Sequence, residues 1–222
     1  CAYCDFLSGP AGEKEKEEYV KMLVDEIRNC PDTVQNYRVI SIFFGGGTPS
    51  LLTGEQIGRL MDTVREIFTL DEDAEITMEM NPGTVTEEKL RKYRQAGVNR
   101  LSIGLQSVND EELRLLGRIH TYEEFLEAYH LARANGFANI NVDLISAIPG
   151  QTVESWRRTL EQVMALSPEH ISAYSLILEE GTTFYKKYVE DEAKEGPKLP
   201  DEDAERQMYW DTETLMEKNG YH

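Results

Sequence analysis

Strand-like and helix-like segments alternate along the first 178 residues, and this alternation constrains the fold more than any other feature of the sequence. Short runs rich in β-branched and aromatic residues are the expected strands, and they span residues 39–44, 75–80, 100–105, 139–145 and 170–178. Stretches with apolar residues at helical spacing are the expected helices, and they span residues 15–30, 55–68, 87–96, 111–116, 123–135 and 153–166. Strict alternation is typical of a parallel sheet, because each parallel strand needs a long crossover before the next.

Polar residues mark where four of these helices are expected to begin. Thr53, Thr84, Asn109 and Thr121 each precede an expected helix, and each has Glu or Gln three residues later. This spacing resembles a capping box, in which two side chains satisfy backbone groups that the first helical turn leaves without partners. We therefore expect these residues to cap four helices.

The expected strands have two different faces. Three of them carry a polar residue or glycine at every second position, namely Thr77, Glu79 and Asn81; Ser102, Gly104 and Gln106; and Asn139, Asn141 and Asp143. A parallel sheet covered by helices on both sides would instead read as continuous apolar runs. We therefore predict an α/β fold in which a partial (β/α) barrel gathers the polar faces around one interior. A one-sided sheet with a bare, solvated face is the alternative.

The composition changes after Leu178. The segment that follows is dense in charge, contains Pro197 and Pro200, and precedes one more expected helix at residues 201–219. We predict a barrel over residues 1–178, and a charged connector with the start of a further region over residues 179–222. The chain starts at Cys1 without Met and ends without an evident stop signal, so we expect a fragment cut at both ends.

The charge balance excludes several classes of partner. Lys and Arg number 23 and Asp and Glu 41, which gives a net charge of −18. A nucleic-acid-binding protein needs a basic face, and so does an electrostatic membrane anchor. No apolar run approaches the ~20 residues that span a bilayer. We expect no nucleic-acid partner and no integral membrane protein. Three cysteines do not make a disulfide framework, which favours a reducing, cytoplasmic setting.

Two short motifs can carry chemistry. Cys1 and Cys4 form a C-x-x-C pair, which on its own fits zinc, an iron–sulfur cluster, a redox disulfide or two incidental thiols. Residues 45–50, Gly-Gly-Gly-Thr-Pro-Ser, follow the first expected strand. Glycines there let the backbone approach a ligand closely, although a tight turn is the simpler alternative. The segment is neither a P-loop nor a dinucleotide-binding fingerprint.

Polar side chains also stand where successive strands end. Glu79, Gln106 and Asp143 lie at the carboxyl ends of three expected strands, where barrel enzymes place working residues. Arg118 follows a short helix; taken alone it is an ordinary surface arginine, but its guanidinium suits a bound carboxylate. Glu79 and Asp143 also suit an acid–base pair.

In order and spacing, these segments resemble the radical S-adenosylmethionine superfamily. Within it they resemble the family of oxygen-independent coproporphyrinogen III oxidase and the HemW-type haem chaperones. The superfamily's cluster motif is C-x-x-x-C-x-x-C, and Cys1 and Cys4 match its second and third cysteines. The other matching segments are residues 43–50, 79–82, 102–107, 143–145 and 149–152. On this alignment the fragment lacks the barrel's first strand and the first cluster cysteine, four positions before Cys1.

The resemblance implies the cofactors and their ligands. Cys1 and Cys4 would hold a 4Fe–4S cluster beside S-adenosylmethionine, whose carbon–sulfur bond is broken by one electron from the cluster. The expected S-adenosylmethionine contacts are Gly46, Gly47 and Thr48 at the methionine end; Arg118 at its carboxylate; Glu79, Gln106 and Asp143 at amino and ribose groups; and Tyr3 and Ile177 near the adenine.

The branch of the family is indicated by one position. The dehydrogenase carries a further cysteine two positions after the third cluster cysteine, and this sequence has Phe6 there. That favours a chaperone that binds haem and delivers it to respiratory haem proteins, with its haem-contacting histidine motif expected beyond residue 222. One alternative is the oxidase, which acts on a porphyrinogen. The others are a cluster-free hydrolase or lyase and a zinc-binding interaction module. Whether the chain acts as an enzyme is left open.

Overall fold

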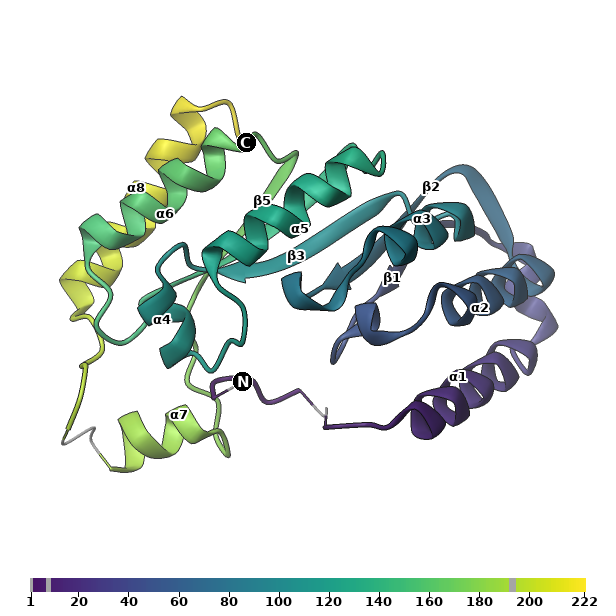
Figure 1. Ribbon diagram of the computed structural model, residues 1–222, viewed down its shortest axis with the longest axis horizontal. Helices are drawn as coiled ribbons and strands as arrows, with labels where there is room; N and C mark the ends of the chain where they lie inside the picture. Colours follow the sequence, from purple (N-terminus) through teal and green to yellow (C-terminus); the bar gives the residue numbers. More distant parts are fainter. Residues whose placement is uncertain (1, 7–8, 192–194) are drawn as a thin grey trace.

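The computed structural model describes residues 2–6, 9–191 and 195–222, and it contains a five-stranded sheet whose spatial order follows the sequence. The strands are β1 (Arg38–Phe44), β2 (Thr69–Met80), β3 (Arg100–Gln106), β4 (Asn139–Ser146) and β5 (His170–Ser175). All neighbouring pairs are parallel. Each connection crosses back through a helical segment (Figure 1), so the carboxyl ends of all five strands lie at one edge of the sheet.

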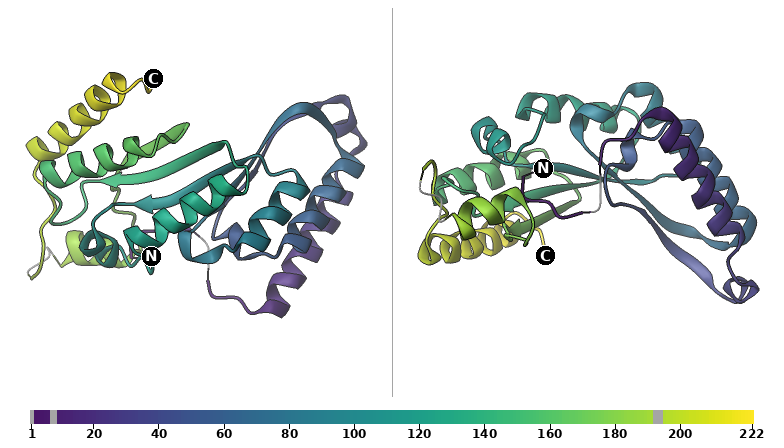
Figure 2. Two further views of the ribbon diagram at one scale, coloured as in Figure 1. Left: turned by 45° about the horizontal axis from the view of Figure 1, so that its top comes forward. Right: turned by 90° about the horizontal axis from the view of Figure 1, so that it is seen from below.

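The helices lie along one side of the sheet, which curls as it goes from β1 to β5 (Figure 2). The longer helices are α1 (Glu13–Arg28), α2 (Gly54–Ile67), α3 (Glu87–Ala96), α5 (Tyr122–Ala134), α6 (Val153–Ala165) and α8 (Glu202–Lys218). The short elements are α4 (Asp110–Leu115), α7 (Thr183–Tyr185), η1 (Asp32–Asn36), η2 (Pro49–Leu51), η3 (Pro82–Thr84) and η4 (Lys186–Glu190). The predicted α/β fold, with parallel strands curled into a partial barrel, is confirmed.

Most helix starts follow the expected capping chemistry. Thr53 and Thr121 form complete capping boxes, and the Asn109 side chain accepts a hydrogen bond from the backbone amide of Glu111. The expectation for Thr84 is wrong. Helix α3 begins after Thr86 instead, because Thr84 belongs to the tight turn η3, where its hydroxyl donates to the carbonyl of Asn81 at 2.7 Å.

The strand ends differ from expectation by more than one residue in two places. β2 begins at Thr69 rather than at residue 75, and β5 ends at Ser175 rather than at residue 178. The early part of β2 is acidic and carries no alternating apolar pattern. It pairs with β1 through Arg38 and Val39, and the register then shifts to place Ser41 opposite Glu75. This irregularity accommodates residues that the sequence pattern does not assign to a strand.

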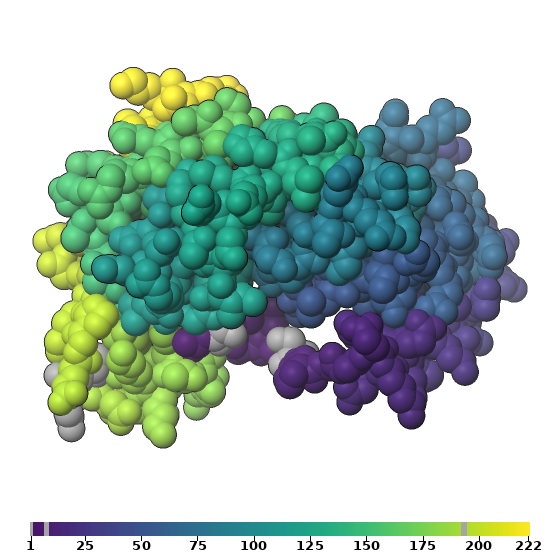
Figure 3. All heavy atoms as spheres, viewed as in Figure 1, coloured from purple at the N-terminus to yellow at the C-terminus, as the bar shows by residue number. Residues whose placement is uncertain are grey.

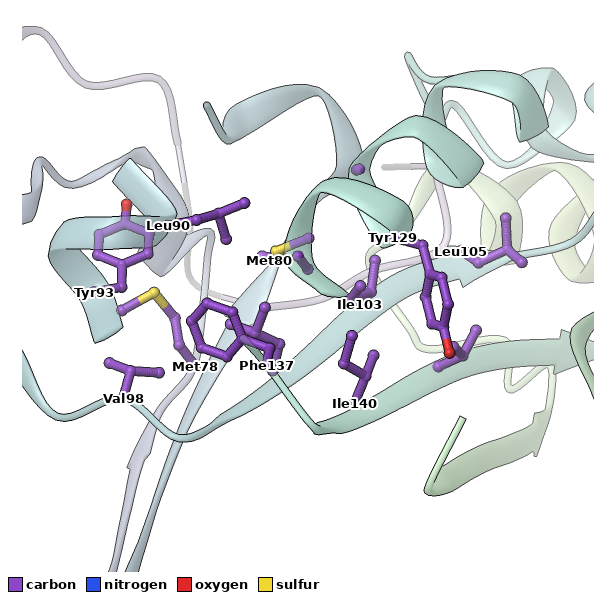
Figure 4. Packing of buried hydrophobic residues seen from close by; sticks show 14 of the residues in the cluster. Met78, Met80, Leu90, Tyr93, Val98, Ile103, Leu105, Tyr129, Phe137 and Ile140 are labelled. Carbon is purple, nitrogen blue, oxygen red and sulfur yellow. The ribbon is translucent and has the colours of Figure 1, made fainter. Parts of the chain in front are cut away.

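The hydrophobic core lies between the helices and the outer face of the sheet. Met78, Ile103 and Ile140 come from three adjacent strands and are fully buried. They belong to the same cluster as Tyr93 of α3 and Tyr129 of α5 (Figure 4). Because successive strand residues point to opposite faces, the intervening positions point to the inner side of the curl, and they are the polar ones.

Helix α8 packs against α6 through a buried tryptophan. The side chain of Trp156 is fully buried, and its Nε1 donates to the carbonyl of Met208 at 3.2 Å and to Oγ1 of Thr212 at 2.9 Å. Met208 belongs to the main core cluster. The division of the chain at residue 178 stays a prediction. Within the described ranges, no helix is both long and apolar enough to cross a bilayer.

The amino-terminal segment lies beside residues that are distant in sequence. The amide of Ala2 donates to the carbonyl of Leu116 at 3.1 Å, and the amide of Phe184 donates to the carbonyl of Ala2 at 2.9 Å. The rings of Tyr3 and Phe184 have centroids 6.5 Å apart. Figure 3 shows this segment close to α7 at one edge of the molecule. These contacts fix the backbone around Cys4 at the carboxyl edge of the sheet.

His120 is a buried histidine whose ring contacts β3. Its side chain is 5% exposed, and its Nε2 lies 3.2 Å from the carbonyl oxygen of Leu105, where a neutral ring donates from Nε2. Burial lowers the pKa of His120 from 6.5 to about 4, and the positive charge of Arg118 adds to the effect. Between these values the unfolded chain binds a proton that the folded chain does not, so stability falls as the pH falls through this window.

We expect replacement of His120 to reduce the acid sensitivity of the fold. Between pH 7 and pH 5, the free energy of unfolding of the wild type should fall by about 1–2 kcal/mol more than that of His120→Gln. Urea denaturation at the two pH values measures this difference. His130 is exposed on α5, so His130→Gln should behave as the wild type does. Equal losses in wild type and His120→Gln would contradict the assignment.

Candidate functional site

The carboxyl ends of the five strands surround one cavity of about 560 Å³. Every described residue that the sequence analysis proposed for the site lines this cavity: Tyr3, Cys4, Gly46, Gly47, Thr48, Glu79, Gln106, Arg118, Asp143 and Ile177. Cys1, the other proposed cluster ligand, lies outside the described residues. The structure therefore brings the candidates together, whereas their roles as ligands stay predictions.

The glycine-rich segment after β1 is held against the end of β2. The backbone amide of Gly46 donates to Oε2 of Glu79 at 3.2 Å. Gly46 has a φ of +108°, a left-handed conformation that favours glycine over other residues. Burial raises the pKa of Glu79; the Gly46 amide opposes this shift and the negative charge of Asp143 adds to it. The segment thus fixes one carboxylate at the wall of the cavity.

The second carboxylate of the cavity, Asp143, is oriented by a hydrogen-bond network across three strands. Ser102 of β3 donates to its Oδ2 at 3.0 Å, and Asn141 of β4 donates from Nδ2 to its Oδ1 at 2.7 Å. The hydroxyl of Ser172 on β5 donates in turn to Oδ1 of Asn141 at 3.0 Å. Burial raises the pKa of Asp143, although these hydrogen bonds and the charge of Arg100 act in the opposite direction. The donors of this network hold the carboxylate of Asp143 in one orientation.

The guanidinium of Arg118 is anchored over the end of β3. Its Nη2 donates to the carbonyl of Gly104 at 2.7 Å and to Oδ1 of Asn81 at 2.5 Å. A Cβ added at Gly104 would lie 3.1 Å from Nη2 of Arg118, 3.1 Å from Nε2 of Gln106 and 3.4 Å from Oδ1 of Asn81. The absence of a side chain at Gly104 therefore leaves the room in which these three groups converge.

Gln106 lies beside Arg118 in a rarely occupied backbone conformation. Its φ is +77°, in the left-handed region, and its side chain is 8% exposed. A left-handed backbone at a residue other than glycine carries a cost of about 1–3 kcal/mol that the surroundings must offset. Such strain clusters at functional sites. This feature supports the choice of Gln106 as a site residue, and the sequence pattern carries no signal for it.

The mouth of the cavity combines a thiol with apolar and aromatic groups. Cys4 is a free cysteine of intermediate exposure. Phe6, Tyr174 and Ile177 are more than half exposed there. Tyr3 is more enclosed: burial raises the pKa of its hydroxyl, and the neighbouring Arg118 opposes the shift. The cavity therefore combines exposed apolar and aromatic side chains with less exposed charged groups.

Several residues that line or support the cavity were missed by the sequence analysis. Asn81, Ser102 and Asn141 were noted only as members of the polar strand faces, without roles. Their position two residues from Glu79, Gly104 or Asp143 on the same face was the available signal. Tyr174 lies on the inner side of β5, and no motif pointed to it.

In charge and shape, the cavity suits a small ligand that carries both cationic and anionic groups. Glu79 and Asp143 can face positive charge, and Arg118 can face a carboxylate. The backbone around Gly46 and Gly47 permits close approach of the ligand's polar end. Ile145 and Ile177 provide apolar contacts of the kind that a nucleobase uses.

Comparison with known proteins agrees with this arrangement. Residues 1–163 match the model of the radical SAM superfamily. The chain is 41% identical over 222 residues to the "Heme chaperone HemW" of Escherichia coli and 35% identical over 223 residues to that of Bacillus subtilis. These matches cover the whole chain but only 57% and 58% of the relatives. A solved structure of Escherichia coli coproporphyrinogen III oxidase, described as a radical SAM enzyme, superposes with a TM-score of 0.87 at 30% identity, over all of this chain and 50% of that one.

Proposed function

This chain belongs to the radical SAM superfamily, and we propose that it forms the barrel of a haem chaperone that binds S-adenosylmethionine and a 4Fe–4S cluster. The observation that carries the proposal is the match of this whole chain to parts of two proteins named haem chaperones. Because the chain spans little more than half of those relatives, haem binding and haem delivery are proposals about the whole protein.

The superfamily implies S-adenosylmethionine and a 4Fe–4S cluster; the polar groups of the cavity fit the first, and Cys4 offers one thiolate to the second. S-adenosylmethionine carries a sulfonium and an ammonium, which suit Glu79 and Asp143, and a carboxylate, which suits Arg118. Gly46, Gly47 and Thr48 would contact its methionine end through backbone and hydroxyl groups, and Gln106 its polar groups. The adenine would lie against Tyr3 and Ile177. Cys4, together with Cys1, would bind the cluster.

The residues of the chain have positioning roles in this proposal. When bound, the cluster and S-adenosylmethionine supply one-electron chemistry. Asp143 is held in one orientation by Ser102 and Asn141, so it requires little reorganisation when a cation binds.

The proposed partners are haem and the respiratory haem proteins that would receive it, in the cytoplasm. Transfer can be measured by mixing the haem-loaded, full-length protein with an apo respiratory haem protein and following the absorbance of the acceptor. Apomyoglobin, in a parallel mixture, reports the rate of passive haem release. We expect transfer to the respiratory acceptor to be faster than passive release. Transfer at the passive rate, or failure to bind haem, would overturn the proposal.

Coproporphyrinogen III oxidase activity is the second candidate, and the structural match favours it. Against it stands Phe6, which occupies the position of a cysteine in the dehydrogenase pattern and is 61% exposed at the cavity mouth. Anaerobic incubation of the reconstituted protein with coproporphyrinogen III, S-adenosylmethionine, a one-electron reductant and an electron acceptor distinguishes the two. Release of carbon dioxide from the propionate groups would establish the oxidase, whereas an unchanged porphyrinogen favours the chaperone.

Substitution of Gly104 provides a test of the assigned pocket. We expect Gly104→Ala to weaken S-adenosylmethionine binding severalfold, because the added Cβ crowds the side-chain ends of Arg118 and Gln106. These flexible ends can shift, so the free energy of unfolding should change by only about 1 kcal/mol or less. Calorimetric titration and thermal unfolding measure the two effects. Gly58→Ala, where a Cβ meets no atom within 4 Å, is the matched control. Unchanged affinity in Gly104→Ala would argue against this pocket.

A further inference from the structure

Asn81, at the end of β2, connects three loops of the cavity through four polar groups. Its amide donates to Oγ of Ser50 at 3.4 Å, and its carbonyl accepts from the hydroxyl of Thr84 at 2.7 Å. Its side-chain Nδ2 donates to Oγ1 of Thr48 at 3.1 Å, and its Oδ1 accepts from Nη2 of Arg118 at 2.5 Å. Backbone and side chain are therefore both held.

These contacts determine which way the amide of Asn81 faces. The guanidinium of Arg118 is only a donor, so the group that meets it must be the amide oxygen. The amide nitrogen then donates to Thr48, whose hydroxyl oxygen accepts. Leu would lose both contacts. Asp would keep the acceptor toward Arg118, and the Thr48 hydroxyl could turn to donate to it, but Asp would bring a negative charge. Asn satisfies both neighbours at once.

The neutrality of this contact matters because the cavity is already acidic. Glu79 and Asp143 line the same cavity as Arg118, and burial raises the pKa of both carboxyl groups. An additional carboxylate beside Arg118 would offset the positive charge that the guanidinium presents to a ligand. An amide oxygen fixes the guanidinium at hydrogen-bond distance and adds no net charge.

We propose that Asn81 is a positioning residue that holds Arg118 for the carboxylate of S-adenosylmethionine and adds no negative charge beside the guanidinium. This inference rests on the proposed S-adenosylmethionine site, and it assigns to Asn81 the selectivity of that site for a ligand with a carboxylate. Asn81 acts through Arg118 and Thr48.

The test compares two ligands that differ in one group. S-adenosylmethionine carries the carboxylate, and decarboxylated S-adenosylmethionine lacks it but keeps both cationic groups. The affinity of each is measured by calorimetric titration, under anaerobic conditions, with the full-length protein and its reconstituted cluster. Since the same pair of ligands is used for every variant, other contacts of the carboxylate cancel when variants are compared.

Two substitutions at Asn81 separate the anchoring hydrogen bond to Arg118 from the neutrality of the contact. Asn81→Ala frees Arg118 from one anchor and should weaken S-adenosylmethionine binding about tenfold, the scale of one hydrogen bond to a charged group, with a smaller effect on the decarboxylated ligand. Asn81→Asp keeps the acceptor and adds negative charge. It should weaken binding of S-adenosylmethionine at least as much, yet leave binding of the more cationic decarboxylated ligand unchanged or stronger.

Asn99→Ala is the matched control. Asn99 bridges the amide of Ile76 and the carbonyl of Ala74 at 2.8 Å each, near the opposite end of the sheet from the cavity. Its replacement should affect thermal stability and leave the ratio of the two affinities unchanged. Asn81→Asp is close in size to the wild type, so it keeps the test decisive if Asn81→Ala unfolds.

The outcomes separate this inference from the proposed function. Parallel losses for both ligands in the Asn81 variants, or a wild type that does not favour the ligand with the carboxylate, would overturn the role of Asn81. A wild type that discriminates through Asn81 but does not deliver haem would leave this inference standing and remove the chaperone proposal. Haem delivery by a protein in which Asn81 does not affect the discrimination between the two ligands would support the chaperone proposal and overturn the role of Asn81.

Discussion

Replacing Cys4 with Ala is expected to abolish assembly of the iron–sulfur cluster and leave the fold intact. Cys4 is a free thiol on the wall of the cavity that contains Glu79 and Arg118. The segment around it is held by the backbone of Ala2, which bonds to Leu116 and Phe184, rather than by the thiol. Loss of one thiolate therefore removes a cluster ligand at little cost in packing.

The measurement is anaerobic reconstitution of a form of the protein that also carries the cysteine expected four positions before Cys1. The wild type should take up iron and sulfide and show the broad visible absorbance of a thiolate-bound cluster, whereas Cys4→Ala should stay nearly colourless. Cys30 lies at the end of α1, where its Sγ approaches the carbonyl of Glu26, so Cys30→Ala should reconstitute normally. A Cys4→Ala protein with full iron content would rule out Cys4 as a ligand, and a wild type that binds zinc alone would favour the interaction-module alternative.

The architecture could be predicted because the alternation of polar and apolar residues lies within each strand and can be read from neighbouring positions. Over residues 76–80 of β2, 100–106 of β3 and 139–144 of β4, every second residue is apolar and belongs to the buried core, while Thr77, Ser102 and Asn141 face inward. A period of two residues can only mean two faces, and parallel strands bring their carboxyl ends to one edge. The gathering of Glu79, Gln106 and Asp143 followed from these two facts alone.

The roles expected of Arg118, Tyr3 and Ile177 came from the family resemblance. Taken alone, Arg118 was an ordinary surface arginine, and only its contacts with Gly104 and Asn81 place it in the cavity wall. Tyr3 and Ile177 likewise carried no local signal. The position of Tyr3 depends on the pairing of Ala2 with Phe184, 182 residues apart, which no periodic pattern encodes. Beside Ile177, the amide of Leu176 donates to the carbonyl of Ser146.

The errors also have a physical origin. Thr84 and Glu87 match the capping-box spacing, but Thr86 matches a simple N-cap equally well. In the structure Thr84 belongs to the turn η3, and Thr86 caps α3. Asn109 caps α4 as expected, whereas Glu112, three residues later, does not complete the box. Its carboxylate turns into the interior, because a buried set of donors from other segments competes more strongly than one exposed amide.

Glu112, on α4, is the buried centre of a polar cluster that joins the loop after β3 to the start of α6. Its side chain is 6% exposed. Its Oε2 accepts from the hydroxyl of Ser107 at 2.6 Å and from Nε2 of Gln151 at 2.9 Å, and its Oε1 accepts from the hydroxyl of Ser155 at 2.5 Å. Ser107 follows β3, Gln151 lies in the connection between β4 and α6, and Ser155 lies in the first turn of α6. Glu112 thus supports the loops that follow Gln106 and Asp143.

Glu112→Ala should therefore lower the free energy of unfolding by about 3 kcal/mol or more, because it removes a buried acceptor and leaves three buried donors without partners. For a chain of this size the melting temperature should fall by roughly 6–12 °C. Calorimetry measures both quantities. The neighbouring Glu111 is exposed, so Glu111→Ala should stay within about 0.5 kcal/mol of the wild type. Glu112→Gln keeps the size but presents an amide to the Gln151 donor, so its loss should be intermediate. A Glu112→Ala protein as stable as Glu111→Ala would mean that the three donors find other partners, and that the loops at this edge of the sheet are held by packing alone.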